Sequence, residues 1–241
     1  MISPLVVKLV GCFPKSITGY ISDKVLNGYV KKYADMDIIG KENLNGVQRP
    51  ILFISNHLSN SDALVLGNVF KEENLTFVAG KKLNENSLTK LGMSMTKTIC
   101  INPNTADKNA ISNIVKALKS GESVLIFPEG TRSRTASMNK AKKGVVLIQK
   151  LTKASVIPVG ICGTENLLPI SDKDMADESF QYAKVKVNIG KKLEIPKKHK
   201  DEKKHEYEDR VSDFFMCEIA KLLPERYRGV YSFDEGDKIE K

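Results

Sequence analysis

The stretch ILFISNHLSNSD (residues 51–62) is the most informative part of the chain. Ile51 to Ser55 is a short apolar run with the length of a buried strand, and polar turn residues follow it at once. A helical pattern then runs from about Asp62 to Phe70. A buried strand that leads through a turn into a helix is typical of a parallel α/β sheet. We therefore expect residues 56–62 to lie at the carboxyl edge of a sheet, where open α/β folds bind their ligands.

The same alternation of strand and helix continues along the chain. Apolar runs predict further strands at residues 76–79, 98–101, 123–127 and 155–161, and helical patterns predict helices over about 106–120, 143–153 and 207–222. Residues 184–189 alternate apolar and polar side chains, which is typical of a half-exposed, edge-like strand. The sequence thus predicts an α/β fold with a mostly parallel central sheet flanked by helices.

The pattern divides the chain into three parts. The boundary between a helical N-terminus and the sheet falls near residues 35–45. We expect an amphipathic helical hairpin over residues 1–37, the α/β domain over residues 38–230 and a frayed tail over residues 231–241, because the chain after Pro224 is weakly patterned.

The N-terminal segment contains two amphipathic patterns. In the first, which Pro14 ends, one stripe is apolar: Ile2, Leu5, Val6, Leu9, Val10 and Phe13. The second runs from about Ser16 to Tyr33, and lysines are scattered through both. The two helices either lie in a membrane interface, with the lysines toward anionic headgroups, or pack on the protein's own core. No run of 18 or more apolar residues is present, so a spanning helix is not expected.

The composition is that of a folded domain with an anionic partner. The 241 residues are 41% hydrophobic, which suffices for a core without disulfides or a structural metal. Four widely spaced cysteines form no CxxC pair, which argues against a zinc site and fits a reducing compartment: Cys12, Cys100, Cys162 and Cys217. The net charge of +9 favours a nucleic acid, a membrane surface, or a phosphorylated or CoA-like substrate.

His57 and Asp62 are the first candidates for chemistry. Two of the three histidines, His199 and His205, sit among lysines on what reads as a solvated face. On a regular helix, residues five apart point about 140° away from each other, but a turn rich in Ser and Asn could fold Asp62 back onto His57. The carboxylate then fixes the imidazole as a general base. In the alternative interpretation, Ser59 or Ser61 caps the helix and His57 hydrogen-bonds only locally.

A second polar motif, FPEGTRS (residues 127–133), follows another buried strand and should emerge at the same edge of the sheet. Gly130 allows close approach of the backbone, and Arg132 offers a planar fork of donors suited to phosphate. Glu129 could pair with Arg132 or position a polar group of a substrate. Taken alone, the motif also fits a strand-to-helix turn with an arginine on the surface.

Together these motifs resemble those of the glycerolipid acyltransferase superfamily, specifically the 1-acylglycerol-3-phosphate acyltransferases. The family's first motif, Asn-His-x4-Asp, is matched at Asn56, His57 and Asp62, and its third, FPEGTRS, is matched at residues 127–133. A fourth motif around a proline is matched at residues 156–159, and the first and third motifs lie about 70 residues apart, as in the family. The resemblance covers about residues 38–195. It implies that His57 is the catalytic base, that Asp62 is its partner, and that Glu129, Gly130, Thr131 and Arg132 bind the acceptor phosphate.

The sequence departs from the family in two places. The second motif usually ends a strand with a phosphate-binding arginine, whereas residues 98–104 read TICINPN. The usual Ala-Lys-x-Glu-Leu segment appears as AGKKL (residues 79–83), in which Lys81 or Lys82 supplies the positive charge. Acyl transfer is expected to remain, but the acceptor could be glycerol 3-phosphate or another lysolipid.

The resemblance implies an enzyme that acylates the free hydroxyl of a lysophospholipid to give phosphatidic acid. The acyl donor is expected to be acyl-CoA or an acylated acyl-carrier protein, with no bound cofactor, no metal and no nucleic-acid partner. Because the acceptor is amphiphilic, we expect the two N-terminal helices to associate with the membrane. The protein is then peripheral or monotopic, on the cytoplasmic face of a membrane with anionic lipids. A non-enzymatic basic module that binds lipid or nucleic acid is the alternative, although the chain has no Trp and no recognisable nucleic-acid motif.

Overall fold

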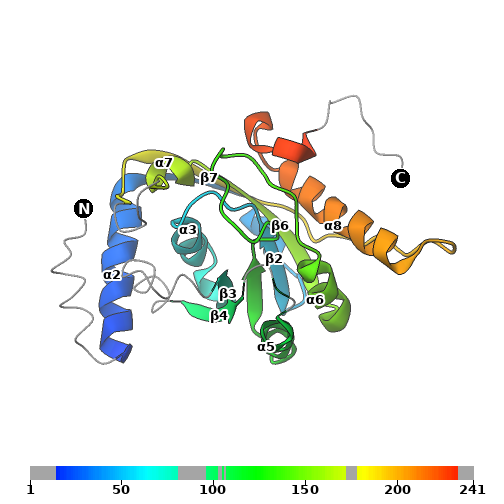
Figure 1. Cartoon of the computed structure of the whole chain (residues 1–241). Coiled ribbons are helices and arrows are strands. Elements are labelled where there is room, and N and C mark those ends of the chain that lie inside the picture. The colour runs from blue at the N-terminus through cyan, green and yellow to red at the C-terminus, as the bar shows by residue number, and fades with distance from the viewer. Residues whose placement is uncertain (1–14, 81–95, 103–104, 106, 172–177, 233–241) are drawn as a thin grey trace.

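A central β-sheet organises the part of the chain that the structure describes, residues 15–80, 96–102, 105, 107–171 and 178–232 of a computed structural model (Figure 1). Within these residues the sheet has seven strands in the order β1-β7-β6-β2-β5-β3-β4. The strands are β1 (Ala34–Ile39), β2 (Ile51–Ser55), β3 (Leu75–Gly80), β4 (Lys97–Ile101), β5 (Ser123–Ile126), β6 (Ser155–Cys162) and β7 (Ala183–Ile189).

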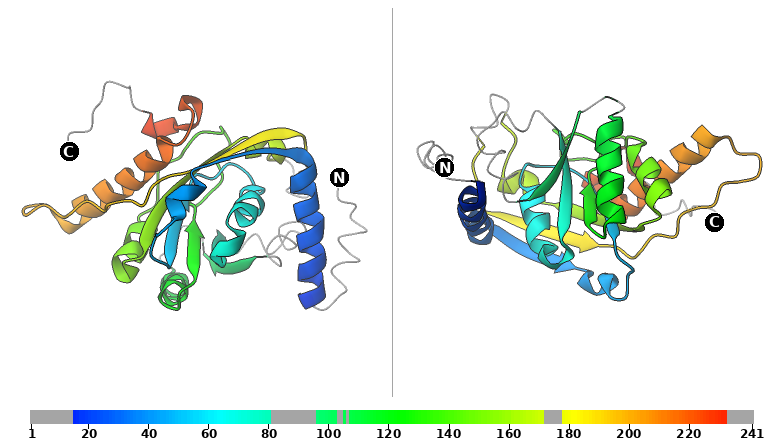
Figure 2. Two further views of the ribbon diagram at one scale, coloured as in Figure 1. Left: turned by 180° about the vertical axis from the view of Figure 1, so that it is seen from behind. Right: turned by 90° about the horizontal axis from the view of Figure 1, so that it is seen from below.

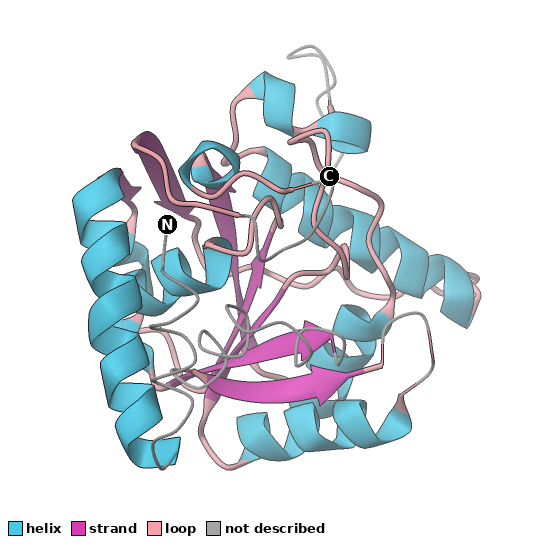
Figure 3. Cartoon of the chain, turned by 60° about the vertical axis from the view of Figure 1, so that its left-hand side comes forward, coloured by secondary structure: helices cyan, strands magenta, loops and turns pink. Residues whose placement is uncertain are grey.

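Helices cover both faces of this sheet (Figure 3). They are α2 (Lys15–Tyr33), α3 (Asp62–Val69), α5 (Lys108–Lys119), α6 (Gly144–Thr152), α7 (Thr164–Leu167) and α8 (Lys204–Ala220). Helices α5, α6 and α8 contribute to one buried apolar cluster, and α2 and α3 contribute to a second. The two clusters lie on opposite faces because alternate residues of a strand point to opposite sides. In β2, Leu52 and Ile54 belong to the first cluster, and Ile51 and Phe53 belong to the second. The predicted α/β architecture is therefore confirmed.

Two strands run against the other five. Strands β2, β3, β4, β5 and β6 are mutually parallel, whereas β7 pairs antiparallel with β6 and parallel with β1. The view from behind shows β1 and β7 side by side (Figure 2). Because of this reversal, the first residues of β1 and β7 lie at the edge of the sheet where β2 and β6 end.

The position of β7 corrects one expectation. Residues 184–189 were expected to form an edge-like strand, but β7 lies between β1 and β6, and β1 is the edge. The alternation itself is real, since Val185, Val187 and Ile189 are buried while the residues between them are more exposed. Such alternation reports that one face of a strand meets water and does not report whether the strand has one neighbour or two. Strand β1, which the sequence pattern did not single out, spans the boundary placed after residue 37.

The N-terminal helix α2 buries its apolar side inside the protein. Leu26 and Val30 are 2% and 4% exposed and belong to the cluster that α3 and the sheet also build. Asn68 of α3 donates a hydrogen bond to Asn27 at 2.8 Å. A helix over residues 16–33 is confirmed, and its side chains Leu26 and Val30 pack on the core. The first predicted helix lies outside the described residues.

In the described part of the chain, no helix has both the length and the apolar character that crossing a bilayer requires.

Residues 225–232, which follow Pro224, pack on the body of the protein. Two 3-10 turns, Glu225–Tyr227 and Gly229–Tyr231, follow α8, and Tyr227 and Tyr231 are buried in the cluster around α8. The amide of Met138 donates to the carbonyl of Tyr227 at 2.8 Å, and the amide of Ala141 donates to the Tyr231 hydroxyl at 3.1 Å. Hydrogen bonds to the loop after β5 thus hold this segment in place, although its own sequence is weakly patterned. Residues 233–241 lie outside the described residues.

Candidate active site

His57 and Asp62 form a hydrogen-bonded pair at the end of β2. The Nδ1 of His57 lies 2.7 Å from Oδ2 of Asp62, whose side chain is fully buried, while the imidazole is 19% exposed. A buried carboxylate beside Nδ1 favours the tautomer with hydrogen on Nδ1, which leaves Nε2 as the acceptor. The pair therefore has the arrangement of a general base and the group that orients it.

The turn between the two residues folds Asp62 back, as the sequence suggested. Asp62 is the first residue of α3, and its amide donates to the Ser59 carbonyl at 3.2 Å. Its Oδ2 also accepts hydrogen bonds from the amides of Leu58 at 2.7 Å and Ser59 at 2.9 Å. The same oxygen thus receives three donors, while Oδ1 is buried without a hydrogen-bond partner. The turn fixes the carboxylate, and the carboxylate fixes the imidazole.

The serines of this turn attach it to the segment after β6. Ser59 Oγ donates to the Leu168 carbonyl at 2.7 Å, and Ser61 Oγ lies within hydrogen-bond distance of Ser59 Oγ and the Thr164 carbonyl. Ser61 precedes α3 but makes no side-chain capping hydrogen bond. Ser61 therefore does not cap α3, and Ser59 Oγ instead accepts a hydrogen bond from the Ser61 amide at 3.1 Å.

Asn56 attaches the end of β2 to β6. Its Nδ2 donates to the Ile161 carbonyl at 2.8 Å, and its Oδ1 accepts from the Ile161 amide at 2.9 Å. Asn56 is fully buried, so its amide replaces the strand-to-strand pairing at the point where β2 turns away. Its place in the first motif is thus structural.

The motif at residues 127–133 contacts His57 from the neighbouring strand. β5 pairs with β2 in parallel, so both turns emerge at one edge of the sheet. The ring of Phe127 stacks on the imidazole with centroids 4.0 Å apart and planes 12° apart. The Ser133 amide donates to the His57 carbonyl at 2.8 Å, and the His57 amide donates to Glu129 Oε1 at 2.9 Å. The predicted meeting of the two motifs is confirmed.

Glu129 does not pair with Arg132, which was one of the two expectations for it. Its carboxylate is buried, and its second oxygen, Oε2, accepts hydrogen bonds from the amide of Asn139 at 2.8 Å and from the side chain of Asn139 at 3.0 Å. Burial raises the pKa of Glu129, and the hydrogen bonds from Asn139 and His57 oppose that shift. Glu129 therefore holds the His57 backbone in place.

Gly130 and Thr131 form the turn that follows. Gly130 has a positive φ of 69°, a conformation that glycine adopts without strain. A Cβ at this position would lie 2.9–3.0 Å from the side chain of Lys142, so the lysine stem covers the turn closely. Thr131 is exposed beside it. Because the end of a lysine side chain can move aside, the positive φ is the main reason for glycine at this place.

Arg132 is held by a glutamate that the sequence motifs did not indicate. Its Nη1 lies 2.9 Å from Oε1 of Glu178, whose side chain is fully buried, and the arginine side chain is 16% exposed. Oε2 of Glu178 accepts a hydrogen bond from Asn60 Nδ2 at 2.7 Å. Glu178 lies in an acidic stretch, residues 172–178, in which no spacing distinguishes it from its neighbours. The other two predicted substrate residues, Lys81 and Lys82, lie outside the described residues.

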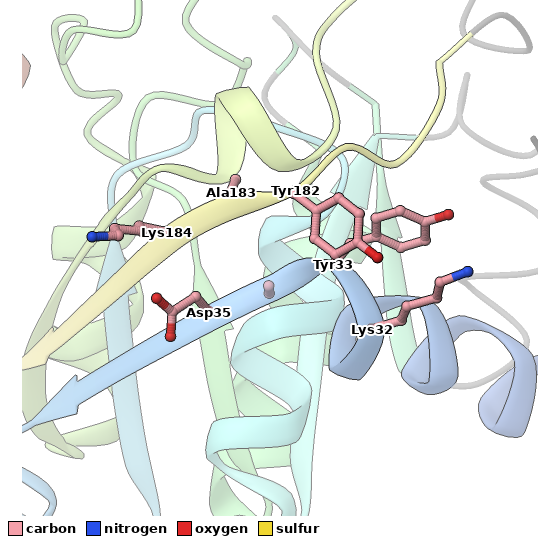
Figure 4. Close-up of a pocket in the computed structure, with 7 residues that line it drawn as sticks. Lys32, Tyr33, Asp35, Tyr182, Ala183 and Lys184 are labelled. Carbon is pink, nitrogen blue, oxygen red and sulfur yellow. The ribbon is translucent and has the colours of Figure 1, made fainter.

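A surface hollow of about 320 Å³ lies at the same edge of the sheet, between the end of α2 and the starts of β1 and β7 (Figure 4). Its walls include Lys32, Tyr33, Asp35, Tyr182 and Lys184. The rings of Tyr33 and Tyr182 have centroids 4.8 Å apart, and Tyr182 is 74% exposed. The hollow contains no residue of the two motifs, so it is a separate feature of this edge.

Comparison with known proteins places the site in a family. A family model described as Acyltransferase matches residues 35–162. A chloroplastic 1-acyl-sn-glycerol-3-phosphate acyltransferase from Arabidopsis thaliana is 28% identical over 66% of this chain and 43% of that protein. The Bacillus subtilis 1-acyl-sn-glycerol-3-phosphate acyltransferase is 29% identical over 70% of this chain and 75% of that protein.

Several of these relatives are longer than this chain, and one solved structure has a similar fold. The chain spans less than half the length of the plant and yeast relatives, with 43% of the Arabidopsis protein and 45% of the Saccharomyces cerevisiae protein covered. The crystal structure of the 1-acyl-sn-glycerophosphate acyltransferase from Thermotoga maritima matches with a TM-score of 0.57 and 22% identity, over 90% of this chain and 88% of that chain, which supports the fold. Because the family model covers just over half of the chain and includes both motifs, the chain belongs to the acyltransferase family.

Proposed function

We propose that the chain is a 1-acylglycerol-3-phosphate acyltransferase. It transfers a fatty acyl group from a thioester donor to the free hydroxyl of 1-acylglycerol 3-phosphate and releases phosphatidic acid and the free thiol. The observation that carries the proposal is the His57–Asp62 pair, whose free imidazole nitrogen lies at the sheet edge that also carries Arg132. The names of the similar curated proteins support the same acceptor.

His57 acts as the general base in this proposal. Its Nε2 takes the proton of the acceptor hydroxyl as the oxygen attacks the thioester carbonyl carbon, and buried Asp62 stabilises the imidazolium that forms. The tetrahedral intermediate collapses with cleavage of the carbon–sulfur bond. The thiolate leaves readily, since a thiol pKa is about 8.5, and takes up the proton from the imidazolium. No covalent acyl-enzyme is needed.

The loop at residues 129–132 orients the acceptor. Arg132 is a partly exposed cation on the motif that contacts His57, and its planar fork of donors matches the oxygens of a phosphate monoester. We assign phosphate binding to Arg132 with the turn of Gly130 and Thr131, and to Lys81 and Lys82. Holding the phosphate places the hydroxyl next to Nε2, and such positioning can lower the barrier by several kcal/mol.

Replacing Arg132 by alanine should raise the KM for lysophosphatidic acid about 10- to 100-fold, because a hydrogen-bonded charge pair with the phosphate is lost. The KM for the acyl donor should stay unchanged. The assay measures transfer of a radiolabelled acyl group by the purified chain to four acceptors: lysophosphatidic acid, glycerol 3-phosphate, lysophosphatidylcholine and monoacylglycerol.

The matched control for this assay is Arg49→Ala, since Arg49 pairs with Glu73 beyond the opposite end of β2. Preference for glycerol 3-phosphate or for a neutral acceptor would assign the chain to another acceptor class of the same family. Salt-dependent retention on DNA without acyl transfer would favour the non-enzymatic alternative.

The donor in this proposal is acyl-CoA or acylated acyl-carrier protein. Both carriers are anionic, and the chain's net charge of +9 favours the encounter with either. The same assay with the two donors in parallel distinguishes them.

We propose that the enzyme works at the cytoplasmic face of a membrane, with residues 1–14 as its anchor. Leu26 and Val30 of α2 pack on the core, while exposed groups of this helix, such as Tyr20 and Lys24, contact the headgroups. Lys32 and Tyr182, which line the hollow at the edge of the sheet that carries His57, are also exposed to solvent. Lysines near an anionic surface contribute about 1 kcal/mol each, and tyrosines suit the headgroup layer.

Deleting residues 2–14 should abolish most sedimentation with vesicles that contain anionic lipid, because the apolar stripe of that segment is removed.

The double substitution Lys24→Glu and Lys32→Glu should weaken sedimentation several-fold in low salt and less in high salt. Circular dichroism checks that both variants keep the fold. Undiminished sedimentation of the deletion variant would contradict the anchor.

A further inference from the structure

Glu178 connects the two halves of the candidate active site. It is a fully buried carboxylate, and it comes from neither motif. One of its oxygens lies 2.9 Å from Nη1 of Arg132 in the turn after β5, and the other accepts from Nδ2 of Asn60, at 2.7 Å, in the turn after β2. A single side chain thus fixes the distance between the turn that carries the base and the turn that carries the guanidinium.

The geometry determines how Arg132 is presented. A guanidinium is rigid and planar, so a hydrogen bond at Nη1 restricts where its other N–H groups point. Arg132 keeps 16% of its side chain exposed while Glu178 has none, so the arginine is the member of the pair that solvent reaches. Asn60 lies between His57 and Asp62 in sequence and is only partly buried. The buried carboxylate therefore holds both turns from the protein interior, where it does not contact a bound acceptor.

A buried carboxylate is stable only when it is paired and hydrogen-bonded, and both conditions are met here by residues of the site. Replacing such a pair by apolar residues often costs little stability, so stability alone gives no reason for a charged group at this place. The place of Glu178, between the turn that carries His57 and the turn that carries Arg132, gives a functional reason for the charge.

We propose that Glu178 is a positioning residue that holds Arg132 at a fixed place relative to His57, so that an acceptor bound by its phosphate has its hydroxyl at Nε2. This inference rests on the proposed function. Glu178 acts through Arg132 and Asn60 and does not touch the substrate.

Glu178→Ala should raise the KM for lysophosphatidic acid about 10-fold or more and leave the donor KM unchanged, since the orientation of Arg132 is lost. Glu178→Gln should stay within about threefold of the wild type, because its carbonyl oxygen can accept from Arg132 and its amide can donate to Asn60 once the Asn60 amide flips. A glutamine variant as impaired as the alanine variant would overturn the hydrogen-bonding role.

A double-mutant cycle separates positioning from general support of the fold. On the Arg132→Ala background, adding Glu178→Ala should change the acceptor KM less than about twofold, because the phosphate-binding side chain that Glu178 positions is already gone. An equal fold-loss on both backgrounds would overturn the proposal. Glu202→Ala is the matched control, since Glu202 also pairs with an arginine, Arg210, but at the start of α8. Thermal unfolding of each variant confirms that it is folded.

A binding measurement makes the inference independent of turnover. Calorimetry with a short-chain hexanoyl lysophosphatidic acid should give a Kd about 10-fold higher for Glu178→Ala and near wild type for Glu178→Gln. If this pattern holds while the wild type transfers no acyl group, the proposed function fails and the role of Glu178 stands. If acyl transfer proceeds and Glu178→Ala binds this lipid as tightly as the wild type, the role of Glu178 fails alone.

Discussion

His57→Ala is expected to lower the rate of acyl transfer about 10³-fold while leaving the fold intact. The loss follows from removing the base that accepts the hydroxyl proton, a contribution of roughly 10²- to 10⁴-fold in enzymes of this kind. The fold should persist because the hydrogen bonds that join His57 to the neighbouring motif come from its backbone, although the stacking on Phe127 is lost. Its amide donates to Glu129 and its carbonyl accepts from Ser133, and alanine keeps both groups.

The measurement compares kcat for acyl transfer and the far-UV circular dichroism spectrum of His57→Ala with those of the wild type. His205→Ala serves as the control, because that side chain is 66% exposed on α8. A His57→Ala variant that retains more than about a tenth of wild-type kcat would show that the hydroxyl proton is removed by another group, and the mechanism proposed above would then be wrong.

Asp62→Asn is expected to lower kcat about 10²-fold, less than the loss of His57. The Oδ2 position of Asp62 receives the amides of Leu58 and Ser59 as well as His57 Nδ1. These two amides should draw the carbonyl oxygen of the asparagine into that position, so the imidazole keeps its tautomer and orientation. What is lost is the negative charge that stabilises the imidazolium.

Asp62→Ala supplies the contrast for this prediction. It leaves three donors around an empty position, and each unsatisfied buried donor costs about 1–3 kcal/mol. The alanine variant should therefore lose both kcat and several degrees of melting temperature, whereas the asparagine variant should lose mainly kcat. Asp209→Asn, on an exposed ion pair with Lys143, is the control. Equal kcat values for wild type and Asp62→Asn would mean that the carboxylate only supports the turn.

Much of the candidate site could be predicted because its chemistry is local in sequence. His57 and Asp62 are five residues apart in a turn rich in Ser and Asn, so the contact depends on short-range geometry that the residue types favour. The meeting of this turn with residues 127–133 follows from two adjacent parallel strands. Both inferences needed only the strand pattern and the rule that parallel strands end at one edge.

The features that could not be predicted depend on contacts distant in sequence. Glu178 lies 46 residues from Arg132, and its neighbours are also acidic, so no local pattern shows which carboxylate turns inward. The role of Glu129 was uncertain for the same reason, since pairing with Arg132 and bonding to the His57 amide both fit the motif. Strand β1 was missed because Asp35 and Asp37 alternate with Met36 and Ile38, a weak pattern that only pairing with β7 stabilises.

The reversal of direction at β7 places the connection after this strand at the opposite end of the sheet from the candidate active site. Because β7 runs against β6, the chain that leaves β7 travels toward the opposite end of the sheet from His57, where the Leu193 amide bonds to Val156 near the start of β6. The lysine-rich connection that follows, residues 197–203, extends away from the body of the protein before α8 (Figure 1). That connection is the natural place to graft a fluorophore or an affinity tag, since a label there leaves the reactive edge unobstructed.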